Sequence, residues 1–272
     1  MAIRITTGLA NKLAQGYGLR ELLRDGRFYV YSGSQPATGD LAPVGTNLIV
    51  FTLDGNAYTP PVQSKAKITI SGSTGTINTV TVGGLGYNLL SLPVAVTSGS
   101  YGLAADALAA SINGKDNPLN IVATSDGIDS VTLFTPYWLG AEGNGLTIAT
   151  TQTSSTVVIN AGNSAVFGGT GSPGAGVTAI NGLNFEYPAV AGRLSKPSGE
   201  NWRGVGAADG QAGWFRFVAG GSSVSASGAT EVRFDGNIST SGGDINAASL
   251  IIQAGAPQTF SRFSVYIPMT EL

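Results

Sequence analysis

Two aromatic strand patterns near opposite ends of the chain constrain its fold more than any other feature. The first is GRFYVYSG, residues 26–33, and the second is GWFRFVAGG, residues 213–221. Each sets large side chains in a short run closed by glycine, which is typical of a β-strand. In the first, Phe28 and Val30 fall on one face, and Tyr29 and Tyr31 on the other. Because a strand needs a partner, we expect both patterns to belong to one β domain.

The stretch between these patterns has a different texture. After YTPPVQ, aromatic residues become rare and Thr, Ser and Val alternate in KITISG and NTVTVGG. One helix is predicted in this stretch, YGLAADALAASIN, with an apolar stripe of Leu103, Ala107, Leu108 and Ile112. We therefore predict a discontinuous domain, residues 1–62 and 189–272, interrupted by an inserted domain, residues 63–188. A folded insert is tolerated in a surface loop because closure entropy grows slowly with loop length.

The predicted fold class is mainly β. The flanking domain is expected to be β-sandwich-like with two short N-terminal helices, and the insert to be a β-rich α+β domain. The helices are indicated by Leu9 and Leu13, four residues apart, and by the leucines of YGLRELLRDG. Hydrophobic residues make up 42% of the chain and charged ones 11%, with 40 glycines, a composition that favours buried strands and tight turns over charged helical surface.

Absent residue types exclude several function classes. The chain has no His and no Cys, which removes the commonest general base, the thiolate nucleophile and the commonest metal ligand. A net charge of −2 gives no general attraction to nucleic acid. The first 15 residues lack the apolar core of a signal peptide, and no run of about 18 apolar residues follows. We expect no enzymatic activity, no cofactor or metal, and neither a nucleic-acid nor a membrane partner.

Three patterns could still carry chemistry, and each has a simpler interpretation. GTGSPG, residues 169–174, fits a dinucleotide fingerprint, but Pro173 and the absence of a following apolar helix favour a linker. Asp126 with Asp129, and Asp235 with Asp244, could pair as glycosidase carboxylates, yet Asp126 and Asp235 precede glycine as turn residues do. The loop DGNISTSGGD has too few acids for a calcium loop.

Three stretches outside the insert resemble a group of short tailed-bacteriophage virion proteins. They are ITTGLANKLAQGYGLRELLRDGRFYVYSGSQPATGDLAPVGTNLI, then GAADGQAGWFRFV, then VRFDGNISTSGGDINAASLIIQAGAPQTFSRFSVYIP. The most specific part is the run from the Leu-rich helix through YSGSQPATGD. In the insert, AADALAASIN, VTLFTP, GAEGNGLTIAT and FGGTGSP resemble a small α+β module of phage tail sheath and other virion proteins. The resemblance implies a non-enzymatic building block of a virus particle.

The leading hypothesis is a capsid decoration or cement protein, located in the virion and made in the bacterial host cytoplasm. Its partners would be the major capsid protein or tail proteins, with self-association as a symmetric homo-oligomer. A tail or baseplate component and a receptor- or glycan-binding module remain alternatives; the last predicts converging aromatic residues on the insert. Candidate interface residues are Arg20 and Arg24, from the basic N-terminal segment, and Tyr29 and Tyr31, from the first aromatic strand.

Overall fold

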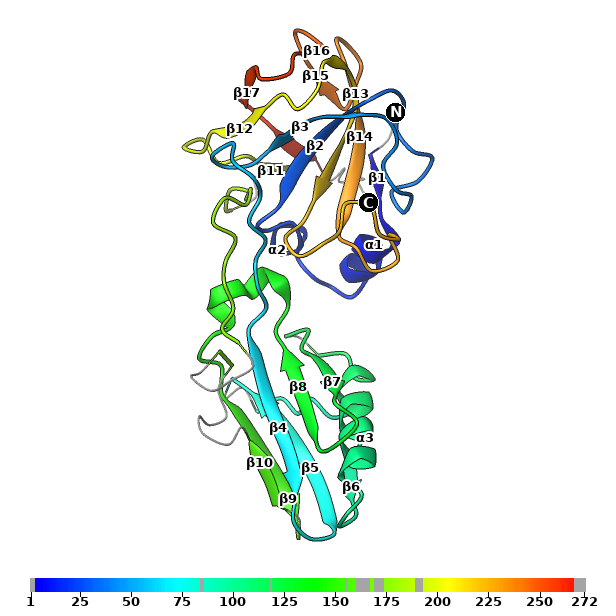
Figure 1. Ribbon diagram of the computed structural model, residues 1–272, viewed down its shortest axis with the longest axis vertical. Coiled ribbons are helices and arrows are strands. Elements are labelled where there is room, and N and C mark those ends of the chain that lie inside the picture. Colours follow the sequence, from blue (N-terminus) through cyan, green and yellow to red (C-terminus); the bar gives the residue numbers. More distant parts are fainter. Residues whose placement is uncertain are drawn as a thin grey trace, which may run out of the picture. The chain divides into compact units, whose positions relative to one another are not determined.

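The computed structural model describes residues 3–83, 86–117, 119–154, 156–159, 167–168, 174–188 and 193–266. The chain divides into two compact units, both visible in Figure 1. Unit 1 consists of Met1–Pro60 and Ala179–Leu272, and unit 2 of Pro61–Thr178. Strands dominate over helices, which confirms the predicted mainly β fold.

Unit 1 contains two short helices and eleven strands among its described residues. These are β1 (Arg4–Ile5), α1 (Thr7–Ala14), α2 (Leu19–Leu22), β2 (Arg27–Ser32), β3 (Asn47–Phe51), β11 (Arg193–Ser195), β12 (Trp202–Val205), β13 (Gly210–Val218), β14 (Arg233–Ser239), β15 (Ile245–Asn246), β16 (Ile251–Ile252), β17 (Pro257–Phe260) and β18 (Ser264–Tyr266).

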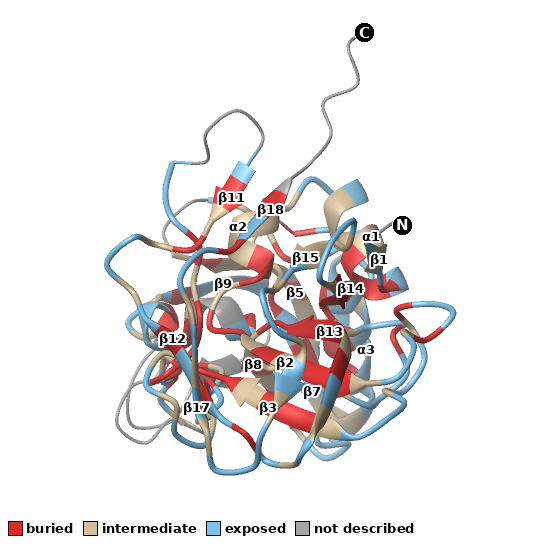
Figure 2. Cartoon of the chain, turned by 90° about the horizontal axis from the view of Figure 1, so that it is seen from above, coloured by how far each residue is buried: buried red, intermediate tan, exposed pale blue. Residues whose placement is uncertain are grey.

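The main sheet of unit 1 has the order β1-β14-β13-β2-β3, with every neighbouring pair antiparallel. β15 adds to β14 and β16 to β13. In the pairing of β13 with β2, Phe217 lies opposite Phe28 and Phe215 opposite Val30. The two aromatic strand patterns are therefore direct neighbours, as predicted. Figure 2 shows buried residues concentrated on β2, β3, β13 and β14.

One face of this sheet carries an aromatic core. Phe28 stacks on Phe215 with ring centroids 4.8 Å apart, and Phe260 of β17 packs edge-on to Phe28 at 4.9 Å. Trp202 and Phe263 lie in the same cluster, from the two-stranded pairs β12-β17 and β11-β18 and their loops. These pairs are stacked, edge-on and tilted, with centroids at the separations typical of packed aromatic rings. The short strand pairs therefore form a second layer over the sheet, in keeping with the predicted sandwich-like packing.

The N-terminal helices form where the leucine spacing predicts them. The Thr6 hydroxyl accepts from the backbone N–H of Leu9, an N-terminal cap for α1. Leu9, Leu22 and Leu23 are buried. Helices this short are not stable alone, so packing of these leucines on the rest of unit 1 holds them.

The second domain boundary lies at 178 rather than at the predicted 188. The Asn181 side chain donates to the Asp54 carboxylate at 3.0 Å and to the Ala57 carbonyl at 2.9 Å. Leu183 and Gly26 exchange two backbone hydrogen bonds. Residues 179–188 therefore brace unit 1, although they form no regular strand that a sequence pattern could reveal.

Unit 2 contains seven strands, one α-helix and one 3-10 helix among its described residues. These are β4 (Lys65–Ser71), β5 (Gly75–Val82), β6 (Val94–Val96), α3 (Tyr101–Asn113), β7 (Val122–Ser125), β8 (Ser130–Phe134), η1 (Tyr137–Gly143), β9 (Ile148–Thr153) and β10 (Thr156–Ile159). They form two sheets, β10-β4-β8-β7 and β6-β5-β9.

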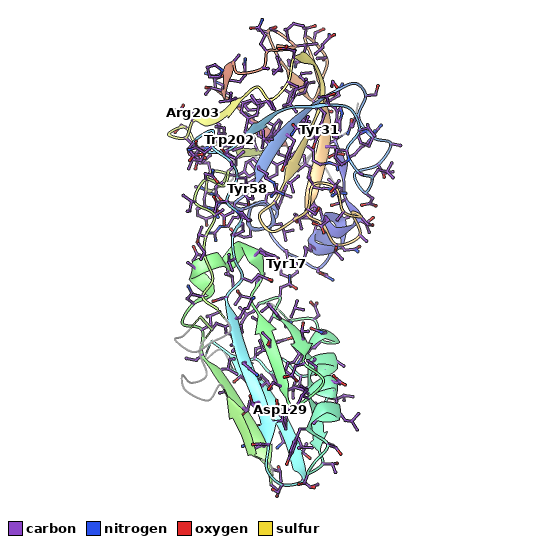
Figure 3. All side chains as sticks on the ribbon, viewed as in Figure 1. Tyr17, Tyr31, Tyr58, Asp129, Trp202 and Arg203 are labelled. Carbon is purple, nitrogen blue, oxygen red and sulfur yellow. The ribbon has the colours of Figure 1, made fainter. Side chains whose placement is uncertain are left out.

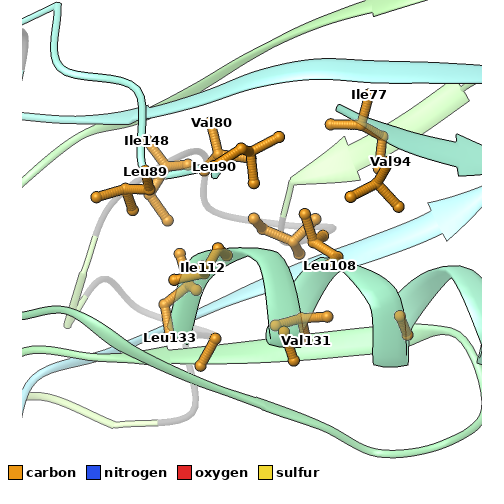
Figure 4. Packing of buried hydrophobic residues seen from close by; sticks show 14 of the residues in the cluster. Ile77, Val80, Leu89, Leu90, Val94, Leu108, Ile112, Val131, Leu133 and Ile148 are labelled. Atoms are coloured by element: carbon orange, nitrogen blue, oxygen red, sulfur yellow. The ribbon is translucent and has the colours of Figure 1, made fainter. Parts of the chain in front are cut away.

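The core of unit 2 is aliphatic, in contrast to that of unit 1. Figure 4 shows Leu108 and Ile112 of α3 between Val80 of one sheet and Leu133 of the other. The predicted apolar stripe on α3 is partly wrong, because Leu103 is 74% exposed and Ala107 is also exposed. Alanines at 104, 105 and 109 complete the buried face instead. Small side chains let the helix backbone lie close to its neighbours, which a search for large apolar residues overlooks.

Candidate functional site

The second face of the unit 1 sheet carries the side chains that point away from the aromatic core, because successive residues of a strand face opposite sides. Trp214 and Arg216 of β13 lie on this face, opposite Tyr31 and Tyr29 of β2. On the other side of β13, Asp235 of β14 lies opposite Arg216. Cross-strand register therefore brings a cation, a carboxylate and three aromatic rings together.

Arg216 and Asp235 form a fully buried ion pair. The arginine donates from Nε and Nη2 to the two carboxylate oxygens, both at 2.7 Å, and both side chains are 0% exposed. A planar guanidinium matches a carboxylate in this two-point geometry. Burial raises the pKa of the Asp235 carboxyl above its ordinary value, while the hydrogen bonds from Arg216 act in the opposite direction.

The remaining donors of Arg216, and those of Arg233, hold two loops onto this face. Arg216 donates to the carbonyls of Leu41 and Val224, and Arg233 donates to those of Asp40, Ser223 and Ala226, all within 3.1 Å. Arg233 also donates from Nε to the Gly39 carbonyl at 3.2 Å. The acceptors come from residues 39–41 and 223–226, so two loops far apart in sequence meet over the sheet. Burial lowers the pKa of Arg233 below its ordinary value. We call Arg216, Arg233, Asp235 and these carbonyls the buried arginine network.

This network is structural chemistry rather than a reactive site. Every nitrogen of the two guanidinium groups donates to a carboxylate or carbonyl oxygen, which compensates the cost of burying charge. The sequence patterns single out Asp235 only as a candidate carboxylate paired with Asp244, and they do not single out Arg216 or Arg233. The available signal was two arginines and an aspartate within the aromatic strands WFRF and VRFD, where alternation places them on one face.

Of the two tyrosines predicted to face an interface, Tyr31 is buried, so the predicted exposure of its side chain is wrong. It lies on β2 of the main sheet (Figure 3), is 4% exposed, and stacks on Trp214 with centroids 4.5 Å apart. Burial also raises the pKa of Tyr31. Tyr29 is half-buried and its hydroxyl accepts from Arg27 Nε at 2.7 Å. Tyr31 is hidden because the second face of the sheet is itself covered by loops, which alternation alone does not reveal.

The predicted basic residues Arg20 and Arg24 are half-buried on and after α2. Arg20 donates from Nε to the Phe185 carbonyl at 3.2 Å and forms an ion pair with Glu21 at 2.7 Å. Its guanidinium also lies 5.2 Å from the ring centre of Tyr187. Arg20 therefore has partners within unit 1, and an interface role for Arg20 and Arg24 stays a prediction.

The two predicted carboxylate pairs have local roles. Asp126 accepts from the backbone N–H of Ile128, Asp129 and Ser130, as its turn position predicts, and these bonds lower its pKa. Asp235 does not lie in a turn, contrary to prediction, but within β14.

Asp244 accepts from the backbone N–H of Asn237 at 2.9 Å. Among the described residues, no group of three or more His, Cys, Asp or Glu side chains could hold a metal ion. Residues 169–173 of the glycine-rich motif lie outside the described part of the chain.

The tyrosines of unit 2 make separate contacts. The Tyr87 hydroxyl donates to the Asp116 carbonyl at 2.5 Å, and that of Tyr101 to the Gly72 carbonyl at 2.6 Å. The side chain of Trp138 lies outside the described part. The described rings therefore supply no aromatic cluster for the glycan-binding alternative.

A groove of about 620 Å³ opens in unit 1, between the main sheet and the segment 245–262. Both apolar and polar residues line it. The apolar ones include Val30, Ile49, Phe51, Ile238 and Phe260, and the polar ones include Ser249, Gln258, Thr259, Ser261 and Arg262. Val30, Ile49 and Phe51 are buried, so little of their surface faces the groove. The sequence does not predict this groove, because the groove forms only where the segments after β14 fold back over β2 and β3.

Comparisons of the chain with protein-family models, with curated proteins and with solved structures give no match. In the described part of the chain, no helix has the length and apolar character needed to cross a membrane.

Proposed function

We propose that the protein is a structural component of a tailed-bacteriophage particle, a capsid decoration or cement protein that binds and stabilises the assembled shell. The observation that supports this most is where the three phage-like stretches lie. Their described residues belong to unit 1, and they supply β2, β13 and β14 of the main sheet with parts of β1 and β3. They meet in the buried arginine network, where the first stretch provides the carbonyls of residues 39–41, the second provides Arg216, and the third provides Arg233 and Asp235.

This convergence supports treating the resemblance as one of a complete domain rather than of scattered motifs. A domain of this kind would stabilise a shell by mass action, because a subunit that binds only the assembled form lowers the free energy of that form. In the proposal, unit 1 contacts the major capsid protein and copies of the chain associate symmetrically. The local roles of Asp126, Asp235 and Asp244 favour a non-enzymatic protein.

The proposal is tested by counting copies of the chain in purified particles with quantitative mass spectrometry. A decoration protein follows the symmetry of the shell, so on the order of hundreds of copies per particle are expected. A small multiple of a ring would assign the chain to the tail or baseplate instead. Absence from purified particles that contain their full set of capsid proteins would contradict the proposal.

A further inference from the structure

One sheet of unit 2, β10-β4-β8-β7, ends at β7, which lies alongside α3 in Figure 1. β7 pairs with β8 from Val122–Phe134 to Ser125–Val131, and no described strand pairs with its other side. In an antiparallel pair, alternate residues direct their backbone groups toward and away from the partner strand. The outward groups of β7 therefore have no strand to bond with.

Two asparagine side chains take the place of the missing strand. Asn113, the last residue of α3, accepts with Oδ1 from the Ala123 N–H and donates from Nδ2 to the Ala123 carbonyl, both at 2.8 Å. Asn117 makes the same two bonds with Ile121, just before β7, at 2.8 and 3.1 Å. A carboxamide carries the donor and the acceptor of a peptide group, so each asparagine replaces one strand residue. The order of the two asparagines is opposite to that of their partners, as in an antiparallel pair.

β7 lacks the features that usually protect the edge of a sheet. Its sequence VATS has no charged residue and no proline, and its pairing with β8 has no register shift. Val122 is 46% exposed, so the strand also presents apolar surface. Edge strands without charge, proline or a bulge tend to pair with strands of other chains. In β7 the hydrogen bonds from the two asparagines are the protection that the structure shows.

We infer that Asn113 and Asn117 form an edge lock, which keeps β7 of one copy of the chain from pairing with β7 of a second copy. A strand adds to an edge through free N–H and C=O groups, and the edge lock occupies these groups at two successive outward positions. Ile121 and Ala123 are at most 4% exposed, so the asparagines also bond backbone groups that water reaches poorly. Symmetric association of the chain then uses surfaces other than β7.

The experiment uses the full chain and three variants. The edge lock is removed in the double variant Asn113→Ala with Asn117→Ala. Asn113→Ala alone is the milder change, because the Asn113 side chain is exposed whereas that of Asn117 is buried. Asn144→Ala is the matched control, since Asn144 makes the same two bonds with Gly176, at 2.8 and 3.0 Å, outside the described strands. A thermal melt shows which variants are folded.

Sedimentation velocity at rising concentration measures self-association, and hydrogen exchange follows the Ala123 amide. We expect both edge-lock variants to form larger species at concentrations where the unchanged chain and Asn144→Ala do not. At low concentration, the Ala123 amide of Asn113→Ala should exchange about tenfold faster, because it has lost its partner, and exchange should slow again as the chains associate. Adding Thr124→Lys, at an exposed position of β7, should abolish this association, since a charge on an edge strand opposes pairing.

The inference is overturned if a folded variant without the edge lock keeps the mass of the unchanged chain at every concentration. Equal association of Asn144→Ala, or association that persists with Thr124→Lys, would also overturn it. If the double variant does not fold, Asn113→Ala alone decides, and unchanged exchange at Ala123 together with an unchanged mass would contradict the inference. These measurements involve no virus particle, so their outcomes are independent of the proposed function.

Discussion

Arg216 and Arg233 are charged residues inside a sheet, and their surroundings explain why they are tolerated there. An unpaired buried charge costs several kcal/mol, whereas a paired and fully hydrogen-bonded one is compensated in part. The carboxylate of Asp235 neutralises one charge, and loop carbonyls accept the other donors. The loops at 39–41 and 223–226 are therefore held by side chains of the sheet.

The buried ion pair predicts a strongly coupled response to mutation. Arg216→Met or Asp235→Leu alone leaves the partner charge buried, so each is expected to lower the free energy of unfolding by about 3 to 5 kcal/mol. The double variant is expected to cost clearly less than the two together, since no charge is then stranded. Urea denaturation of the four proteins gives the coupling, with exposed Arg203→Met as a control. Additive effects would show that the pair does not act as a unit.

Asp54 predicts part of the acid sensitivity of unit 1. Hydrogen bonds from Asn56, and then from Asn181 and Thr52, lower its pKa to about 2 in the folded chain. An unfolded aspartate has a pKa of about 3.9, so the folded state binds this proton less tightly. Asp54 thus contributes stability above about pH 4, which is lost as pH falls toward 2. We expect Asp54→Asn to reduce the drop in melting temperature between about pH 5 and pH 2.5. The same drop in both proteins would exclude this role.

At the scale of elements, features that depend on local sequence patterns can be predicted, whereas features that depend on long-range packing cannot. The helix at 101–113, the strands of KITISG and WFRF, and the Asp126 turn follow from spacing that acts over a few residues. The burial of Tyr31, the arginine network and the groove depend on loops that return from distant positions. The sequence also predicts the wrong unit for residues 179–188, because their contacts with Gly26 and Asp54 produce no periodic pattern in the sequence.

The orientation of α3 provides a test at this scale. Leu108 is 0% exposed and Leu103 is 74% exposed, although both belong to the apolar stripe expected from spacing. Leu108→Ala is expected to lower the free energy of unfolding of unit 2 by about 2 to 5 kcal/mol, because it leaves a cavity. Leu103→Asp is expected to change it by no more than about 0.5 kcal/mol, as at other exposed positions. Denaturant unfolding measures both, and a larger effect at Leu103 would place the other face of the helix in the core.

At the scale of the whole molecule, the chain is one β domain interrupted by another folded unit. Within unit 2, Val62 and Val177 exchange two backbone hydrogen bonds of 2.8 and 2.9 Å, so the chain enters and leaves this unit side by side. Within unit 1, the Leu53 N–H donates to the Asn181 carbonyl at 2.9 Å, so the broken ends of this domain are also adjacent. Adjacent ends mean that the insert imposes little strain on the domain that carries it.

The most direct test of this account is the thermal unfolding of a chain in which residues 61–178 are replaced by a short Gly/Ser linker. Unit 1 has its own aromatic core and its own sheet, so we expect a single cooperative transition, with fluorescence that reports buried Trp202 and Trp214. Residues 61–178 expressed alone are expected to unfold cooperatively as well. Molten, protease-labile products from both shortened chains would contradict the interrupted-domain account, because each core would then depend on the other unit.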